Sequence, residues 1–389
     1  MKKDSIQYDY IICGAGCAGL SLSMHLSNTL FRHKKILILD KDEKTSNDRT
    51  WCFWDKSSDI FSYDDIVSHS WPKIRISDQS RRFVKNLDPL EYKRIKSLDF
   101  YEKAKGIISQ APNIEWKKEE VVDINEDGNS VVVTSTKGDY SASYCFNSIP
   151  KSENDQKEYL LKQHFLGWII EFDKEVFEKD VADLMDFRMP QEDGVRFSYV
   201  LPFSRKRAMI ELTIFSESLL NDQDAYELLL KKYIEDEFGN ISFKIVEKEF
   251  GVIPMSTSSY YTFDKTRIIN IGNSSGRIKP SSGYAFKRIQ EEIDHLARSL
   301  RKNIIPKSLN NKNRFLFYDK ILFNVLLNKR MRGDDVFTTM FEKNSAAAVL
   351  KFLGEKTNII EEALIFSRLP IKPFLKAMIS ELFRRISNK

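Results

Sequence analysis

The fold class follows from one stretch near the N-terminus, Tyr8-Asp-Tyr-Ile-Ile-Cys-Gly14-Ala-Gly16-Cys-Ala-Gly19. Its first half, Tyr8–Cys13, predicts a buried β-strand, and the glycines follow in the spacing Gly-x-Gly-x-x-Gly before a helical stretch. Gly14 permits a tight turn, Gly16 lets backbone approach a pyrophosphate, and Gly19 lets the helix pack on the strand. The helix N-terminus offers unpaired N–H groups and a positive dipole end to phosphates.

A second strand and a terminal acid complete this nucleotide-binding pattern. The strand is predicted over Ile36–Leu39, and Asp40 ends it, 21 residues after Gly19. An acid at this distance would accept hydrogen bonds from the ribose hydroxyls of a dinucleotide. The alternative is a glycine-rich turn in an α/β domain that binds no nucleotide. The strand–turn–helix context favours the dinucleotide site.

A second glycine-rich loop indicates which dinucleotide is bound. The predicted strand Arg267–Ile271 runs into Gly272 and Asn273, and the loop continues through Pro280 and Gly283 to a helix. Flavoproteins use such a return strand to carry backbone past the ribityl chain and isoalloxazine ring of FAD. Pro280 suits the approach to a helix start, and Gly283 lets backbone come close to the ring. We therefore predict FAD, the alternative being a plain strand–loop–helix connection.

Composition indicates a globular chain of two or three domains. The 389 residues are 42% hydrophobic and 30% charged, and the mean hydropathy is −0.40. The longest unbroken apolar run has five residues, so neither a transmembrane segment nor a secretory signal peptide is expected. Four cysteines without a Cys-x-x-Cys pair, and only five histidines, predict no structural metal. The predicted compartment is the cytoplasm.

The net charge of +5 is concentrated at the C-terminus. Residues 1–300 hold 43 Lys and Arg against 48 Asp and Glu, whereas residues 301–389 hold 18 against 8. The last 25 residues alone carry six basic residues and one acidic residue. Because residues 1–300 are acidic overall and contain no known nucleic-acid-binding motif, the sequence gives no support for nucleic-acid binding.

The order of predicted elements indicates an α/β fold in three parts. The first is a discontinuous Rossmann-type FAD-binding domain of the flavoprotein hydroxylase or reductase type, with a three-stranded meander at about 114–149. The second is a β-sheet substrate domain, and the third is a helical C-terminal region. The predicted ranges are 1–75, 101–160 and 262–300 for the first, 76–100 and 161–261 for the second, and 301–389 for the third.

The substrate domain is predicted from strand-like runs that flank one helix. The runs are Phe165–Phe172, Arg196–Pro202, Ala208–Phe215 and Phe243–Ile253, and the helix is Asp222–Glu237.

Five further blocks follow one another along the chain. They are Asp48-Arg49-Thr50-Trp51-Cys52-Phe53-Trp54, Tyr199-Val-Leu-Pro-Phe-Ser204, Ile210-Glu211-Leu-Thr213, Gly251-Val-Ile-Pro-Met255, and Ile271-Gly272 through Gly283-Tyr284. Together they resemble the lycopene cyclase family, a branch of FAD-dependent proteins, over about residues 5–300. The Asp-Arg-Thr-Trp and Glu-x-Thr blocks are fairly specific to that family, whereas Gly-x-Gly-x-x-Gly is shared with many flavoproteins.

This resemblance implies an enzyme that closes the linear ends of a C40 carotenoid. The implied activity is that of a lycopene β-cyclase, an isomerase that converts lycopene to γ-carotene and β-carotene. FAD would be bound in its reduced form, with no net redox change. No second Gly-x-Gly-x-x-Gly is present for NADPH, so the flavin would be reduced by NADPH that binds transiently, or by a partner.

Two residues bear on how the flavin would be held. Arg49 would steady the flavin or pair with Asp48. Broader flavoproteins carry Asp at the position of Asn273, and that Asp usually holds the flavin side chain.

Ring closure on a hydrocarbon needs a proton donor, a cavity that excludes water, and a group that takes a proton back. Glu211 lies on a predicted strand, where it shares one face with Thr213 and Phe215. A carboxyl group among apolar side chains has a raised pKa and can act as an acid near neutral pH. Glu211 is therefore the predicted proton donor, and the alternative is a solvent-facing strand glutamate.

Aromatic side chains are the expected lining of the substrate pocket. Their faces stabilise cations, and a reduced flavin anion would add negative charge without transferring electrons. Each ring could equally belong to the core. The candidates are Trp51, Phe53, Trp54, Phe197, Tyr199 and Phe203.

The C-terminal segment Phe374–Ile386 predicts an amphipathic helix. Its apolar residues recur at helical spacing, and Lys376 and Arg384 add positive charge. Such a helix can lie in an anionic membrane interface, here the inner face of the cell membrane. The alternative is that its apolar face packs on its own domain.

Two functions from other classes remain open. A FAD-dependent reductase or hydroxylase of a prenyl lipid would have the same fold, and it would consume NADPH for each product. A non-catalytic, flavin-binding, membrane-associated protein would hold FAD without turning over a polyene.

Overall fold

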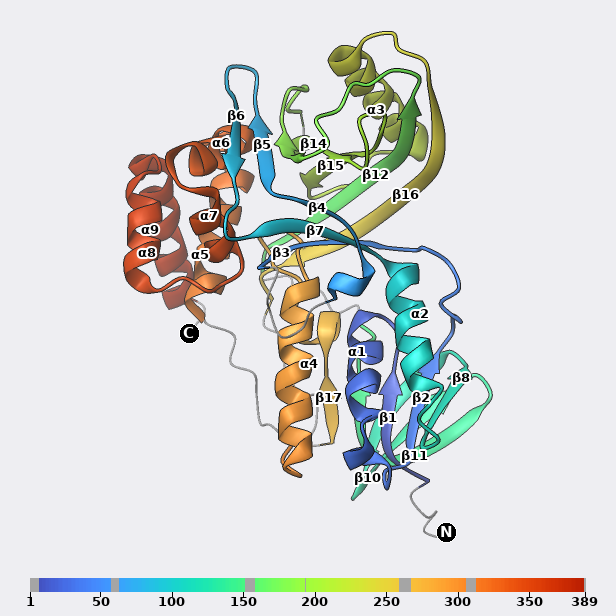
Figure 1. The fold of residues 1–389 in the computed structure, drawn as a ribbon. Coiled ribbons are helices and arrows are strands. Elements are labelled where there is room, and N and C mark those ends of the chain that lie inside the picture. Colours follow the sequence, from blue (N-terminus) through green and yellow to red (C-terminus); the bar gives the residue numbers. More distant parts are fainter. Residues whose placement is uncertain are drawn as a thin grey trace.

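The computed structural model describes residues 7–56, 63–150, 158–192, 194–258, 267–305 and 313–387. Figure 1 shows three parts: a sheet with helices at the bottom, a second sheet at the top, and a group of C-terminal helices at the side. This arrangement confirms the predicted α/β class with a sheet-based second part and a helical C-terminal region. The predicted boundary between residues 261 and 262 lies outside the described ranges.

The first sheet has seven strands and contains the predicted β-α-β opening. Its order is β8-β2-β1-β11-β10-β9, with β17 paired to β11. β8, β2, β1, β11 and β17 run parallel to their neighbours, whereas β9 and β10 are antiparallel. The strands are β1 (Tyr8–Cys13), β2 (Ile36–Asp40), β8 (Ile114–Lys118), β9 (Val121–Asp127), β10 (Ser130–Ser135), β11 (Gly138–Asn147) and β17 (Ile268–Asn270).

The meander is shorter than the predicted range of 114–149. It consists of β9, β10 and β11, whereas β8 pairs in parallel with β2. The reason is the helix that precedes β8, because a helical crossover returns the chain parallel to its neighbour in the sheet.

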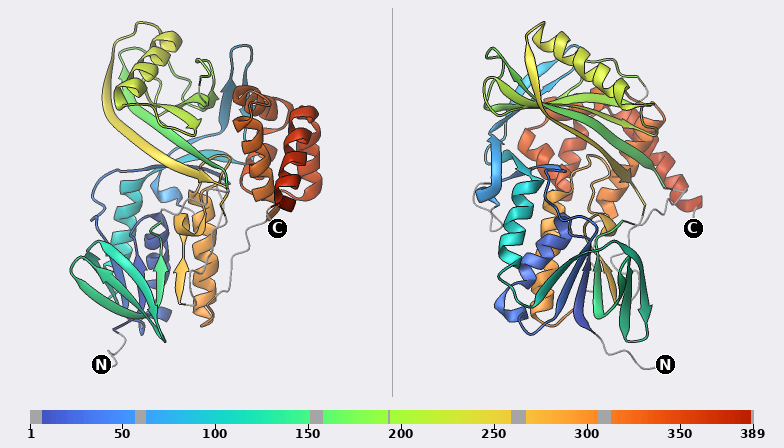
Figure 2. Two further views of the ribbon diagram at one scale, coloured as in Figure 1. Left: turned by 180° about the vertical axis from the view of Figure 1, so that it is seen from behind. Right: turned by 90° about the vertical axis from the view of Figure 1, so that its right-hand side faces the viewer.

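Helices cover one face of the parallel strands of the first sheet, and the meander strands of the same sheet fold over the other face (Figure 2). Ile12 and Ile38 point toward the helices, while Ile11 and Leu39 pack against meander residues such as Val133. The helices are α1 (Cys17–Leu26), α2 (Ser97–Ile108) and α4 (Phe286–Arg301). The strands are therefore buried on both sides, as the unbroken apolar runs of β1 and β2 require.

The second sheet has the order β16-β12-β15-β14-β13-β5-β6. One face is covered by α3 (Gln223–Phe238), and the other looks toward the rest of the molecule. All the predicted runs and the predicted helix are present. The strands are β5 (Lys73–Ser77), β6 (Arg82–Asn86), β12 (Leu160–Phe172), β13 (Val181–Asp186), β14 (Val195–Pro202), β15 (Arg207–Ser216) and β16 (Phe243–Ser256).

The segment near residue 75 joins this second sheet. β5 pairs in parallel with β13, with Val181 opposite Lys73, so the predicted domain boundary between residues 75 and 76 falls inside a strand. A small sheet of order β3-β7-β4 connects the two larger ones. Its strands are β3 (Thr50–Asp55), β4 (Val67–Trp71) and β7 (Glu91–Lys96).

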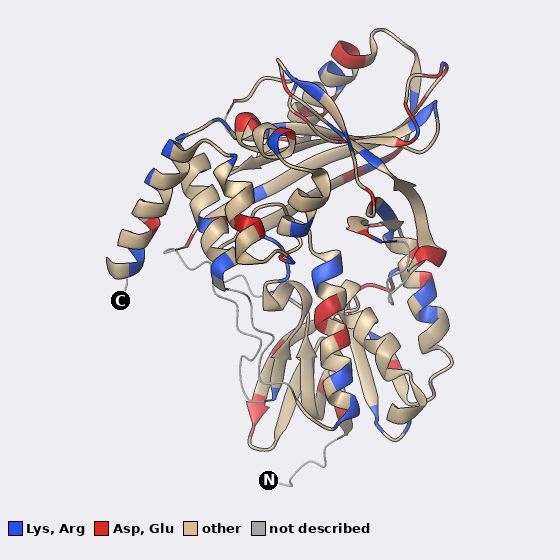
Figure 3. Ribbon diagram, turned by 60° about the vertical axis from the view of Figure 1, so that its left-hand side comes forward, with Lys and Arg blue, Asp and Glu red and all other residues tan. Residues whose placement is uncertain are grey.

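The C-terminal helices form one group beside the second sheet. They are α5 (Asn313–Leu327), α6 (Gly333–Lys343), α7 (Ala346–Leu353), α8 (Ile359–Ser367) and α9 (Ile371–Ser387). Figure 3 shows Lys and Arg spaced along α9. No helix in the described part of the chain has the length and apolar character needed to cross a membrane.

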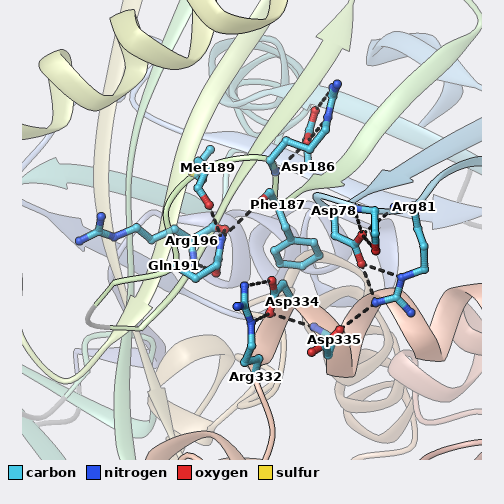
Figure 4. Close-up of polar contacts among 12 residues, drawn as sticks. Asp78, Arg81, Asp186, Phe187, Met189, Gln191, Arg196, Arg332, Asp334 and Asp335 are labelled. Carbon is cyan, nitrogen blue, oxygen red and sulfur yellow. Dashed lines mark hydrogen bonds and ion pairs between the residues drawn. The ribbon is translucent and has the colours of Figure 1, made fainter.

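Polar contacts attach these helices to the edge of the second sheet (Figure 4). The guanidinium of Arg81, beside the β5–β6 turn, donates to Asp78 at 2.7 Å and to Asp335 of α6 at 3.0 Å. A more deeply buried contact joins Lys279 to Asp319 of α5 at 2.7 Å. The helical region is thus held both by the sheet edge and by the glycine-rich loop that precedes α4.

Candidate active site

A cavity of about 610 Å³ is bounded by the second sheet, the small sheet, the loops that follow strands of the first sheet, and α1, α2 and α4. Its size is that of a pocket for one small molecule. One end is formed by the start of α1 and the loop after β17, where Gly16, Asn273 and Gly283 lie on the wall. The other end is formed by the second sheet and contains Glu211 and Glu249. The predicted nucleotide site and the predicted acid therefore share one cavity.

The first glycine-rich turn is shaped by close contacts. Gly14 has φ +94, which favours glycine. A Cβ at Gly19 would lie 1.9 Å from the carbonyl oxygen of Gly14, so the helix can approach the strand only without a side chain there. A Cβ at Gly16 would meet no atom within 4 Å, because this backbone faces the open cavity. The turn leaves room for a phosphate group against N–H groups of α1.

Asp40 lies at the end of β2 beside this turn. Its carboxylate accepts hydrogen bonds from the backbone N–H of Ala15 at 2.5 Å and of Asp42 at 2.8 Å, and Lys44 lies 3.6 Å away. These bonds fix the acid against the glycine-rich turn. The ribose contact stays a prediction.

The second glycine-rich loop passes directly below β12. Gly272 and Gly283 have φ +62 and +71, and a Cβ at Gly283 would lie 2.0 Å from Oε1 of Gln163. Oε1 of Gln163 is buried and receives no hydrogen bond from any described residue. Pro280 is buried in the loop but does not line the cavity. The loop and β12 thus enclose an unsatisfied acceptor on the cavity wall.

Arg49 lines the cavity and is exposed. Its Nη1 donates to the backbone oxygen of Asp48 at 2.8 Å, whereas the Asp48 carboxylate accepts from Ser97 at 3.0 Å and from Tyr101 at 2.8 Å. The predicted contact with Asp48 is therefore made through the backbone, and the guanidinium charge remains available to the cavity.

Glu211 is buried on β15, with 7% of its surface exposed, which excludes the solvent-facing alternative. Thr213, on the same face, donates a hydrogen bond to its Oε1 at 2.9 Å. Burial raises the pKa of Glu211 to about 8, with a further contribution from the charge of Glu249, while the Thr213 hydrogen bond acts in the opposite direction. This carboxyl group can therefore hold its proton at neutral pH.

A second carboxyl group, Glu249 on β16, was not predicted. Gly167 on β12 lies opposite Glu211 on one side and opposite Glu249 on the other. A Cβ at Gly167 would lie 3.3 Å from Cβ of Glu211, so glycine leaves space between the two acids. The sequence signal that could have indicated Glu249 is its place two residues before the Gly251–Met255 block.

The environment of Glu249 differs from that of Glu211. Its carboxylate accepts two hydrogen bonds from Thr50, from the backbone N–H at 3.1 Å and from Oγ1 at 2.7 Å. Burial raises its pKa, but the Thr50 hydrogen bonds and the charges of Arg94 and Arg49 oppose that shift. The pKa of both acids is thus raised, but Glu249 has more hydrogen bonds and nearby positive charges that favour its carboxylate form.

The predicted aromatic residues are divided among different places. Trp51 and Tyr199 line the cavity, with Tyr92 and Tyr284, which were not predicted. Phe53 and Trp54 line a second cavity behind them. Phe197 and Phe203 line neither of these cavities: Phe197 packs on Phe187 and Phe215, and Phe203 packs on His69 and the guanidinium of Arg94. Within the described ranges no group of three or more Cys, His, Asp or Glu side chains could hold a metal ion.

Comparison of sequences relates the chain to carotenoid enzymes. A family model described as lycopene cyclase protein matches residues 9–379. The lycopene beta-cyclases of Paracoccus sp. and Pseudescherichia vulneris are 23% and 22% identical, over 75% and 77% of this chain and 73% and 75% of theirs. A chloroplastic neoxanthin synthase of Solanum tuberosum is 23% identical over 77% of this chain, which spans 61% of that relative's length.

Comparison of structures shows the fold of FAD-binding flavoproteins. A flavoprotein/dehydrogenase of Cytophaga hutchinsonii superimposes with a TM-score of 0.60 at 13% identity, covering 93% of this chain and 98% of that one. A geranylgeranyl bacteriochlorophyll reductase-like protein of Thermoplasma acidophilum has a TM-score of 0.58 at 12% identity, covering 96% and 98%. The halogenase PltM, solved in complex with phloroglucinol and FAD, has a TM-score of 0.53 at 14% identity, covering 90% and 79%.

Proposed function

The chain belongs to the lycopene cyclase family, and on this premise we propose that it closes the linear ends of lycopene into β-rings, forming γ-carotene and then β-carotene. The observation that carries the proposal is the buried Glu211, whose pKa is raised to about 8 beside a second acid in a cavity large enough for a small molecule. An acid of this kind can protonate an alkene at neutral pH, which ring closure requires.

We propose that FAD, in its reduced form, occupies the end of the cavity formed by the two glycine-rich loops. Gly14, Gly16 and Gly19 would receive the pyrophosphate, and Asp40 the adenosine ribose. The loop from Gly272 to Gly283, with Arg49, Asn273 and Pro280, would hold the ribityl chain and the ring. The unsatisfied Oε1 of Gln163 fits this assignment, because the isoalloxazine ring carries an N–H donor.

The bound reduced flavin would supply negative charge close to the cationic intermediates without transferring electrons. NADPH is the proposed reductant that generates this form. Reduction would occur once for many turnovers, since the cyclisation itself consumes no electrons.

The protein residues would move one proton in and one proton out for each ring. Glu211 donates its proton to the terminal double bond, and the neighbouring double bond attacks the resulting carbocation to close the ring. Glu249, as the carboxylate, accepts the proton that leaves the ring. Glu249 then releases that proton to the solvent and Glu211 takes up a proton from it, which restores the starting state, so atoms and charges balance.

The remaining groups would protect the cation until the proton leaves. The walls on either side of the acids carry Trp51 and Tyr199, whose ring faces can stabilise positive charge. Water is disfavoured there because Met209 and Leu201 line the same wall. A cation formed in this setting has few competing nucleophiles.

We propose that the protein reaches its substrate at the inner surface of the cell membrane through the C-terminal helices. α9 packs on α5 through Ala377 and Phe374, yet its outer side exposes Phe383 at 66% and Ile386 at 70%. Ile360 of α8 is 81% exposed. Lys and Arg occur along the same helix (Figure 3), and positive charge suits an anionic interface. One side of α9 thus packs on the protein itself, as in the alternative predicted from the sequence, and the exposed apolar residues would enter the membrane interface.

The test is to express the protein in bacteria that accumulate lycopene and to analyse the pigments by chromatography. The wild-type protein should produce β-ring carotenoids. Glu211→Gln should bind FAD normally but lose ring formation by a factor of at least roughly 100, because the amide cannot donate a catalytic proton. Unchanged lycopene with folded, FAD-loaded wild-type protein would reject the proposal, and NADPH consumption for each product would indicate a reductase.

A further inference from the structure

A second cavity, of about 460 Å³, lies behind the first one. It is enclosed by β3, the start of α4, the turn before β7, and α7 with the residues that follow it. The two cavities share four wall residues, Cys52, Tyr284, Ala285 and Phe286. The two cavities are therefore neighbours, separated by Cys52 of β3 and by the segment from Tyr284 to Phe286.

The shared wall contains two aromatic side chains, Tyr284 and Phe286, and two small residues, Cys52 and Ala285. The ring of Phe286 stacks on Trp51, on the side of the first cavity, at 5.5 Å between centroids, and on Phe53, on the side of the second, at 5.0 Å. Tyr284 donates or accepts a hydrogen bond with Tyr92 at 2.9 Å, and its ring lies edge-on to Trp54 at 4.8 Å. A chain that extends from one cavity into the other would pass between these shared wall residues.

The interior of the second cavity suits an apolar ligand. Phe53, Trp54, Leu90, Ala347 and Leu353 all face it. Such a surface binds a hydrocarbon by removing apolar area from water and offers little to a polar molecule.

The charged residues at the second cavity do not form an anion site. Four of the five basic side chains on its wall are paired with carboxylates. The pairs are Lys287 with Asp55, Arg288 with Glu355 at 3.4 Å, Lys351 with Glu361 at 2.5 Å, and Lys356 with Glu291 at 2.6 Å. The paired charges leave no concentrated positive field for the phosphates of a nucleotide.

We propose that the second cavity binds the part of the linear polyene that lies beyond the reacting end. This inference rests on the proposed cyclase function and extends it. The first cavity has the volume of one drug-sized ligand, so the flavin ring and one end of the polyene would fill it. The remaining hydrocarbon chain requires an apolar space that continues from there. The helical region supplies one wall of that space, which gives residues 346–356 a direct role in substrate binding.

The experiment compares two substrates in variants that fill the second cavity. Ala347→Trp places a large ring in the second cavity without altering a residue of the first. Ala348→Trp is the matched control, since Ala348 is its neighbour on α7 and lines neither cavity. The substrates are lycopene and a shortened polyene with the same acyclic end group, with reduced FAD supplied to the purified protein.

We expect Ala347→Trp to lower kcat/KM for lycopene by roughly tenfold or more, because a filled cavity excludes the distal chain. The same variant should retain its FAD content and its activity on the shortened polyene, and Ala348→Trp should treat both substrates as the wild type does. An unchanged ratio of the two kcat/KM values in Ala347→Trp would overturn the proposal. Should that variant fail to fold, Leu90→Trp fills the cavity from the opposite wall, and the same ratio decides.

Failure of the underlying function has a different signature. A wild-type protein that cyclises neither substrate would refute the cyclase function itself, and the second cavity would lose its proposed ligand with it. If the wild-type protein cyclises both substrates and no variant changes the ratio of their kcat/KM values, only the assignment of the second cavity is refuted.

Discussion

At the scale of single residues, the proposed chemistry depends on two carboxyl groups separated by a glycine. Gly167 is opposite both Glu211 and Glu249, and any larger side chain would occupy the space between them. Among the described residues, Thr50 donates two hydrogen bonds to Glu249 and none to Glu211. This difference is the basis on which we propose Glu249 as proton acceptor and Glu211 as proton donor.

Glu249→Gln tests the coupling between the acids through pH. In the proposed mechanism activity requires protonated Glu211, so it should fall as pH rises through a pKa of about 8. Burial is the main cause of that raised pKa and the negative charge of Glu249 is the second. Removing the charge should therefore lower the pKa of Glu211 and move the alkaline limb of the kcat/KM profile to lower pH.

The same variant should also reduce kcat by roughly tenfold or more, because the proton acceptor is lost. Glu171→Gln is the control, since Glu171 lies on β12 and pairs with Lys244 at 3.8 Å, outside the cavity. An alkaline limb at the same pH in Glu249→Gln and in wild type would contradict the coupling.

Gly167→Ala tests the space between the acids. The added Cβ would lie 3.3 to 3.4 Å from Cβ, Cγ and Oε2 of Glu211, so the carboxyl group must shift by a few tenths of an ångström. We expect a lower kcat with normal FAD absorbance, because a small displacement of a reacting group reduces the rate. Gly106→Ala is the control: no atom lies within 4 Å of its Cβ, and the change in helix α2 should stabilise the protein by about 0.5–1 kcal/mol. Equal kcat values in both variants would contradict the role of Gly167.

At the scale of elements, local sequence patterns predicted individual strands and helices but not which strands pair with one another. β1, β2 and α1 follow from apolar runs and glycine spacing, and the face of Glu211 follows from strand alternation. Glu249 could not be located in the same way. Its position beside Glu211 depends on β16 pairing with β12, and no local signal specifies that register.

The aromatic residues illustrate the same limit. Tyr199 and Phe197 share a face of β14, so alternation treats them alike. How far the cavity extends along the strand depends on α6, whose Phe337 belongs to the core around Phe197. Packing between distant segments therefore decided which ring reaches the cavity. It also placed β8 beside β2 and β5 beside β13.

The prediction for membrane binding concerns the exposed apolar residues on the outer side of α9. Phe383→Ser combined with Ile386→Ser should reduce sedimentation with vesicles of anionic lipid, since each change removes exposed apolar surface that would enter the interface. Leu30→Ser combined with Val122→Ser is the control, because these residues are 59% and 65% exposed on the first part of the molecule. If both double variants bound vesicles equally, the α9 surface would not be the docking surface.

At the scale of the whole molecule, the site exists only where the separate parts meet. The glycine-rich loops contribute the cofactor end, the second sheet contributes the acids, and the small sheet contributes Trp51 and Thr50. The buried pair of Lys279 and Asp319 links the loop before α4 to the helical region. In that region α7 forms a wall of the second cavity, and α8 and α9 carry the exposed apolar surface, so the substrate binding and substrate delivery that we propose would fall in one region.

Cyclisation of lycopene in D₂O by purified protein carrying reduced FAD, under anaerobic conditions, is the decisive test of acid catalysis without redox change. Proton donation by Glu211 predicts β-ring products that contain one deuterium for each ring formed, while the flavin absorbance stays that of the reduced form. Oxidation of one flavin for each product would contradict a non-redox mechanism, and rings without deuterium would contradict proton donation by an exchangeable acid such as Glu211.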